Sequence, residues 1–122
     1  MSTLNEIIKQ LTIAAKQIRR LEAEAKTALY DHNNKGHHHK LMLEKAHILM
    51  HLPESIAQMK TSLEPKLAQS LNNQLSSYSY SAAKAVELNS VFYMSALLYP
   101  EGYTDGDNND LEDFIFQLEI IC

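Results

Sequence analysis

The chain has 122 residues, 45% of them hydrophobic and 21% charged, with only 3 Gly and 3 Pro. These proportions exclude wholesale disorder, favour helices over a β-sandwich or barrel, and indicate a single helical-bundle domain over residues 1–122. The formal net charge of −4 divides into ten Lys/Arg against seven Asp/Glu in residues 1–66, and one Lys against eight acids in residues 67–122, so the basic surplus is too thin for a nucleic-acid-binding protein.

Apolar residues predict a first helix over residues 3–32. They recur at steps of three and four with no Gly or Pro between them, as on one face of a helix. Ser2 or Thr3 is expected to cap its start, and residues 31–36 to end it, because Asn and Gly tolerate the left-handed conformation of a helix C-cap. The predicted inner face consists of Leu4, Ile7, Ile8, Leu11, Ala14, Ala15, Ile18, Leu21, Ala25, Ala28 and Leu29.

A second helix is predicted over residues 38–60, with a kink at Pro53. Proline cannot donate the normal helical hydrogen bond, and it biases the residue before it away from the helical conformation. The predicted inner face carries Met42, Ala46, Leu49 and Met50.

A third helix is predicted over residues 63–77, where leucines repeat at steps of four. Pro65 would lie in its first turn if Ser62 is the cap. The serine- and tyrosine-rich stretch of residues 76–81 is the least patterned part of the chain and is interpreted as the loop that follows this helix.

A fourth helix is predicted over residues 81–99 and is apolar on most sides, as in a helix that is central in a bundle or lies in an oligomer interface. Residues 100–109 have the composition of a loop. Asp110 or Asn109 would then cap a short closing helix over residues 110–121. Its stripe is Leu111, Phe114, Ile115, Leu118 and Ile121. The fold class is therefore all-α, an up-down four-helix bundle with a short additional C-terminal helix.

Glu44, His47 and His51 form the strongest candidate metal site. Spacings of three and four residues place all three side chains on one helical face, and two imidazoles with a carboxylate suit a divalent transition metal such as zinc. The alternative is that they form a polar, solvated face opposite the apolar one, because histidine pairs at this spacing arise easily by chance.

Two further patterns resemble metal sites less closely. His37, His38 and His39 would capture nickel or zinc only adventitiously. Asp105, Asp107 and Asn109 match the first ligand positions of a calcium loop, but the required glycine and the closing glutamate are missing. A turn followed by a helix cap explains these residues better.

Nucleophilic catalysis has little support in the sequence. The single cysteine, Cys122, has no histidine near it and allows no intramolecular disulfide. No Gly-x-Ser-x-Gly elbow or phosphate-binding glycine loop is present. The tyrosines of the second half fit ordinary packing, or alternatively a ligand groove or subunit contact. They are Tyr78, Tyr80, Tyr93, Tyr99 and Tyr103.

The N-terminal sequence lacks the pattern of a signal peptide, and no apolar stretch is long enough to span a bilayer. We therefore expect a cytoplasmic protein with no membrane or nucleic-acid partner and no cofactor. The leading functional hypothesis is a non-enzymatic helical bundle that acts through protein–protein contacts and forms a homodimer. Surplus apolar residues would supply the interface, around Val91, Leu98, Phe116 and Ile120. The alternative is a metal-binding helical protein that uses the Glu44, His47 and His51 face.

Overall fold

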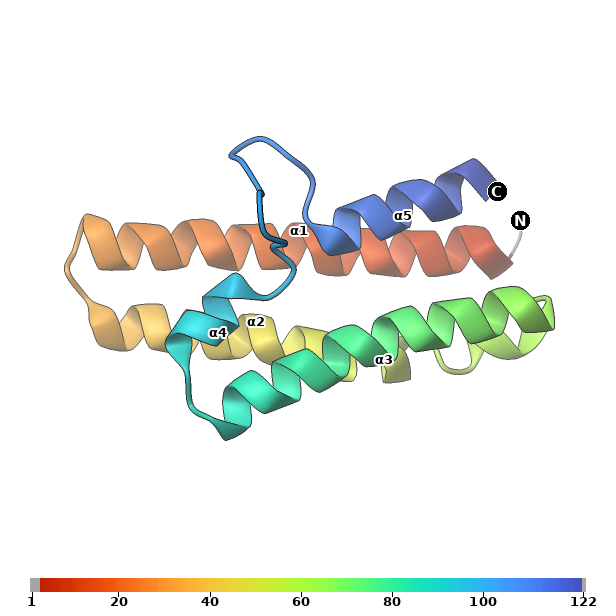
Figure 1. Ribbon diagram of the computed structural model, residues 1–122, viewed down its shortest axis with the longest axis horizontal. Helices are drawn as coiled ribbons and strands as arrows, with labels where there is room; N and C mark the ends of the chain where they lie inside the picture. Colours follow the sequence, from red (N-terminus) through yellow and green to blue (C-terminus); the bar gives the residue numbers. More distant parts are fainter. Residues whose placement is uncertain (1–2, 122) are drawn as a thin grey trace.

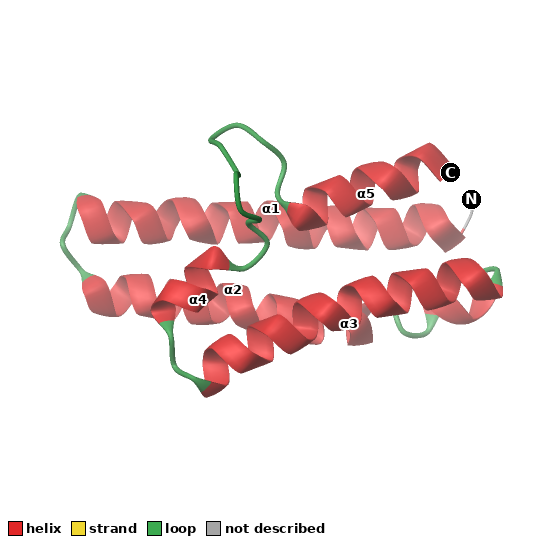
Figure 2. Ribbon diagram, viewed as in Figure 1, coloured by secondary structure: helices red, strands yellow, loops and turns green. Residues whose placement is uncertain are grey.

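A computed structural model describes residues 3–121, and all regular structure in this range is helical (Figure 2). The elements are α1 (Thr3–Tyr30), α2 (Lys35–Ser55), the 3-10 helix η1 (Met59–Ser62), α3 (Pro65–Glu87), α4 (Val91–Ala96) and α5 (Asp110–Ile121). The long helices α1, α2 and α3 pack in sequence order, α5 lies along the N-terminal half of α1, and α4 packs against α2 and α3 (Figure 1). None of the helices within these residues combines the length and the apolarity that a membrane crossing requires.

The core is built on the predicted inner face of α1. Nine of its eleven members are buried, and Ile8 and Leu29 are half-buried at its edges. The neighbouring helices add leucines, alanines and Met94 to the same cluster. Burial of this continuous apolar stripe is the main force that holds the helices together.

The turn between α1 and α2 is shorter than predicted. α1 ends at Tyr30 rather than at residue 32, and Asn33 takes the left-handed conformation with φ 49°. α2 begins at Lys35 rather than at residue 38, because the Asn34 side chain accepts a hydrogen bond of 3.0 Å from the His37 backbone N–H and so caps the helix.

The connection from α2 to α3 also differs from the prediction. α2 ends at Ser55 rather than at residue 60, two residues beyond Pro53, and η1 follows it. The cap of α3 is Glu64 rather than Ser62, because the Glu64 carboxylate accepts hydrogen bonds from the first backbone N–H groups of the helix. Pro65 occupies the first turn, as the sequence predicted, where its missing N–H costs nothing.

The loop predicted at residues 76–81 is absent, because α3 runs through this stretch without a break. Serine is a modest helix former, but the buried stripe of α3 continues across it at steps of three and four. The stripe consists of Leu71, Leu75, Tyr78, Ala82 and Ala85. Tertiary packing thus outweighs the local composition.

The prediction of one long helix over residues 81–99 is wrong, because α3 ends at Glu87 and the chain turns sharply there. Asn89 is left-handed with φ 50°, and the backbone N–H groups of Asn89 and Ser90 bond back to the carbonyls of Val86 and Ala85 at 2.9 and 3.0 Å. This is a Schellman ending, in which asparagine replaces the usual glycine. Only the six residues of α4 follow, capped by the Ser90 side chain.

α5 agrees with its predicted bounds. Asn109 and Glu112 form a reciprocal capping box: the Asn109 side chain accepts from the Glu112 backbone N–H at 2.9 Å, and the Glu112 carboxylate accepts from the Asn109 backbone N–H at 2.8 Å. Four of the five predicted stripe residues are buried, but Ile121, the last residue of the helix, is 62% exposed.

Candidate functional site

A network of charged and phenolic side chains joins α1 and α2 to the segment that follows α4. Residues 97–109, here called the 97–109 loop, connect α4 to α5 and pass over the side of α1 (Figure 1). The loop begins with Leu98, a buried residue in the left-handed conformation at φ 75°. A bulky residue with a Cβ atom is strained in this conformation, and the surrounding contacts must hold it there.

Arg19 is the anchor of the loop on α1. Its guanidinium makes two hydrogen bonds to the Glu112 carboxylate, at 2.6 and 3.0 Å, and donates to the Asp107 carbonyl at 3.1 Å. It also donates to the hydroxyl oxygens of Tyr99 and Tyr103 at 3.2 and 3.3 Å. One planar fork of donors therefore ties the loop and the first turn of α5 to α1.

A second charge pair lies deeper, between α1 and α2. The Tyr99 hydroxyl donates to one Glu22 carboxylate oxygen at 2.6 Å, and Lys45 Nζ lies 2.9 Å from the other oxygen. Lys45 Nζ also donates to the Ser95 carbonyl at 3.1 Å, at the end of α4. The Lys45 side chain is completely buried, with 0% exposure, and the Glu22 side chain is 17% exposed.

Burial and pairing both change the pKa values of these groups. The hydrogen bonds from Arg19 lower the pKa of Glu112, and the same pairing raises the pKa of Arg19. Burial lowers the pKa of Lys45, although the Glu22 carboxylate opposes this change. Burial raises the pKa of Tyr99, and its hydrogen bond to Glu22 raises it further.

The network fixes the positions of α1, α2, the 97–109 loop and the first turn of α5 relative to one another. Two cations, Arg19 and Lys45, meet two carboxylates, Glu22 and Glu112, so the formal charges cancel. The Lys45 amine is inaccessible to a substrate in this conformation. Charged groups that are paired and hydrogen-bonded in this way fix one arrangement of the surrounding elements, because a shifted arrangement would leave a buried charge unpaired.

This network was not predicted from the sequence, and neither Arg19 nor Lys45 was assigned a role there. Lys45 did carry a signal, because it falls at steps of four between Leu41 and Leu49 on the buried face of α2. A lysine within such a stripe implies a buried acidic partner, but the stripe alone does not say which one.

Two grooves border α4. The first, here called the α3–α4 groove, has a volume of about 490 Å³ and lies between the C-terminal half of α3, α4 and the start of α5. The second has a volume of about 420 Å³ and lies between α4 and the facing ends of α1 and α2. Tyr99 lines both, so the network forms the common wall between two hollows.

Glu44, His47 and His51 are all exposed on α2. The rings of His47 and His51 lie edge to face with their centres 6.4 Å apart, and His51 Nδ1 lies 3.7 Å from the Glu54 carboxylate. Within residues 3–121, no three His, Cys, Asp or Glu side chains form a group that could hold a metal ion. The metal-site hypothesis stays a prediction, which a zinc titration tests.

If Glu44, His47 and His51 bind zinc, the metal should raise the melting temperature by mass action, and His47→Ala should abolish the increase. Differential scanning fluorimetry with and without a chelator measures this. His32→Ala is the matched control, because His32 is an exposed histidine outside the site. An equal zinc response in His47→Ala would contradict the site.

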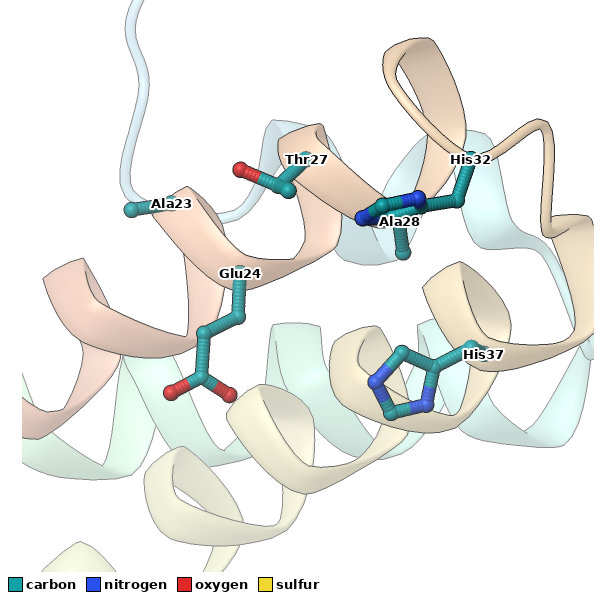
Figure 3. A pocket seen from close by; sticks show the side chains of 6 residues that line it. All are labelled: Ala23, Glu24, Thr27, Ala28, His32 and His37. Atoms are coloured by element: carbon teal, nitrogen blue, oxygen red, sulfur yellow. The ribbon is translucent and has the colours of Figure 1, made fainter.

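The remaining histidines lie near the α1–α2 turn. Figure 3 shows His32 and His37 at the edge of a hollow of about 430 Å³, with Glu24 projecting from α1 on the same side. The hollow is open and mostly apolar in lining, and Ala23 and Ala28 are among the residues that line it. Of the other two histidines of the triplet, His39 Nε2 lies 3.1 Å from the Asn89 side-chain oxygen, within hydrogen-bond distance.

The region that resembled a calcium loop is a turn and a helix cap, as the sequence analysis preferred. The Asp107 carboxylate accepts hydrogen bonds from the backbone N–H and the hydroxyl of Thr104, at 3.2 and 2.9 Å. Asn109 caps α5. Both side chains are therefore occupied by the local backbone.

Comparison of the chain with models of protein families, with curated proteins and with solved structures finds no match.

Proposed function

We propose that this protein is a non-enzymatic up-down helical bundle that acts through protein–protein contacts, and that its first partner is a second copy of itself. The observation that carries the proposal is the outer face of α5. Phe116 and Ile120, four residues apart, are 57% and 69% exposed, opposite the buried stripe of the same helix. Paired large apolar side chains on one helical face are typical of a helix that packs on another surface.

The proposed contact is narrower than the sequence analysis expected. Leu98 is only 7% exposed, because it packs into the core, and Val91 is half-buried. Leu98 and Val91 are therefore excluded from the proposed interface, and Phe116 and Ile120 are kept. In a two-fold symmetric contact between α5 helices, Phe116 and Ile120 of one protomer would pack against the same two residues of the other. This is the simplest closed arrangement.

The charged network supports a role without catalysis at that site. Its side chains bind one another and the backbone, and its most buried amine, that of Lys45, faces the Ser95 carbonyl and the Glu22 carboxylate. The geometry therefore supports a rigid scaffold that presents a surface. A metal-binding function at Glu44, His47 and His51 is the alternative, and the zinc titration described above decides it.

Phe116→Asp should convert the dimer to a monomer while the helical circular dichroism stays unchanged. A standard interface buries about 800 Å² on each partner, and a carboxylate at its centre would lose its hydration without a partner. Sedimentation equilibrium over a range of protein concentrations measures the change. Ile13→Asp is the matched control, because Ile13 is 52% exposed on α1 and should leave the dimer intact. A wild-type protein that is monomeric at high micromolar concentration would refute the proposal.

A further inference from the structure

The α3–α4 groove has the shape and lining of a small-molecule site. Its volume is about 490 Å³, within the range of about 300–1,000 Å³ that ligand pockets occupy. Ala85 and Leu98 are buried at its base, and the half-buried Leu97 adds a third apolar wall. Two of these residues belong to the segment that the Schellman turn and the left-handed Leu98 set in place.

Aromatic rings line the same groove. Tyr80 on α3 and Tyr93 on α4 stand at its mouth and are 66% and 54% exposed, and Tyr99 lines it from the loop. The faces of aromatic rings attract cations, and best when water is excluded. The Tyr80 ring already has a cation near it, since Lys84 Nζ lies 5.8 Å from the ring centre.

Asp110 lines the groove from the first turn of α5. Its backbone is held at both ends, since its N–H donates to the Leu98 carbonyl at 2.9 Å and its carbonyl accepts from the Tyr78 hydroxyl at 3.1 Å. Its carboxylate, by contrast, makes no hydrogen bond or ion pair with any side chain or backbone group in residues 3–121. Partial burial and the charge of Asp113 raise the pKa of this carboxyl group, so its negative charge is held in an unfavourable place.

The charges around the groove favour a cation as the occupant. Lys84 is the one basic residue of the lining, and its Nζ lies 3.5 Å from the Glu87 carboxylate. Within residues 3–121 Asp110 has no such counterion, and Asp113 adds a second negative charge in the same first turn of α5. The local balance is therefore negative, and an incoming cation would offset it.

We infer that the α3–α4 groove binds an amphipathic organic amine, whose ammonium group pairs with Asp110 and whose aromatic or short alkyl body lies between Tyr80, Tyr93 and the two leucines, Leu97 and Leu98, that begin the 97–109 loop. The two requirements are met by different walls of one cavity: the apolar body is buried by the base, and the charge is met at the start of α5. This site is separate from the outer face of α5 proposed for dimerisation, and it does not depend on that contact.

Three probes that share one phenylethyl group test the charge and the groove together: phenethylamine, neutral 2-phenylethanol and anionic 3-phenylpropanoate. Nuclear magnetic resonance titration of isotope-labelled protein should show saturable shifts at Leu88, Tyr93 and Leu97 with phenethylamine. The alcohol should bind about tenfold more weakly, which is the loss of one charge-assisted contact, and the carboxylate more weakly still.

Two matched variants locate the cation. Asp110→Asn should weaken phenethylamine binding about tenfold, whereas Asp113→Asn, in the same helical turn, should leave binding within about twofold. Tyr93→Leu should also weaken it, and since Tyr93 is exposed this variant should keep the wild-type melting temperature. Phe116→Asp should bind the amine like the wild type, whatever its oligomeric state.

Three results would overturn the inference. The first is no saturable shift up to about 10 mM phenethylamine, which would mean a Kd well above the millimolar range. The second is equal binding of the alcohol and the amine, which would leave an apolar groove without charge selection. The third is tighter binding of the carboxylate, which would assign the groove to Lys84 and an anion.

Discussion

Glu22→Ala should lower the free energy of unfolding by about 3–5 kcal/mol, the loss expected when one partner of a buried ion pair is removed. The Lys45 ammonium, 2.9 Å from Glu22 and fully buried, would lose the only carboxylate that pairs with it within residues 3–121. The Tyr99 hydroxyl would lose its acceptor as well. For a chain of this size the melting temperature should fall by about 10–20 °C.

Urea unfolding followed by circular dichroism measures the change in the free energy of unfolding. Two further variants serve as comparisons. Glu24→Ala removes an exposed carboxylate two residues further along α1 and should change stability by less than about 0.5 kcal/mol. Lys45→Met replaces the buried ammonium with an apolar side chain of similar length and should cost less than Glu22→Ala, because the Glu22 carboxylate that it leaves is 17% exposed and keeps its hydrogen bond from the Tyr99 hydroxyl. If Glu22→Ala and Glu24→Ala were equally mild, the pair would not contribute to stability.

Arg19→Met should lower the free energy of unfolding by about 2 kcal/mol, through the loss of its charge-assisted hydrogen bonds to Glu112, Tyr99 and Tyr103. The expected loss of stability is modest because the Arg19 side chain is 37% exposed, so water screens part of the interaction. The 97–109 loop should also become a protease target. Arg19→Lys should restore little, because an ammonium cannot reproduce the two-pronged contact with Glu112.

The pairing of Arg19 with Glu112 should also appear as a dependence of stability on pH. The pKa of Glu112 in the folded protein lies below its ordinary value of 4.5, so the folded state binds this proton less readily than the unfolded state. The contribution of the pair is therefore present above pH 4.5 and is lost as the pH falls through the lowered pKa. The free energy of unfolding, measured by urea denaturation between about pH 3 and 6, should rise more steeply with pH for the wild type than for Arg19→Met. Identical slopes would contradict the pairing.

Much of the fold was predictable because it depends on apolar spacing. The inner face of α1 and four of the five residues of the α5 stripe were identified from steps of three and four. The errors occurred where a local preference and a tertiary contact disagree. Serine-rich residues 76–81 stay helical because Leu75, Tyr78 and Ala82 keep the stripe, and the helix ends instead at Asn89, whose left-handed turn no apolar spacing reveals.

The candidate site was less predictable, because its members are far apart in the chain. Arg19 and Glu112 are separated by 93 residues, and each looks like an ordinary exposed residue in its own helix. Lys45 alone broke its local pattern. The capping role of Asn109 was predictable because a cap is a local feature, whereas the partner of a buried charge is set by how the helices pack.

The burial of Lys45 has a consequence for the order in which the chain acquires its structure. Glu22 and Lys45 face each other across α1 and α2, so a hairpin made of the first half of the chain carries this charge pair on a side still open to water. Residues 91–112, which supply the Ser95 carbonyl and the Tyr99 ring over it, are synthesised later. Before residues 91–112 are in place, the hydrated Glu22–Lys45 pair interrupts the exposed apolar face of the hairpin. Continuous apolar faces of this kind are the surfaces through which incomplete chains associate. Closure by α4 and the loop then removes that water as the last part of the core forms.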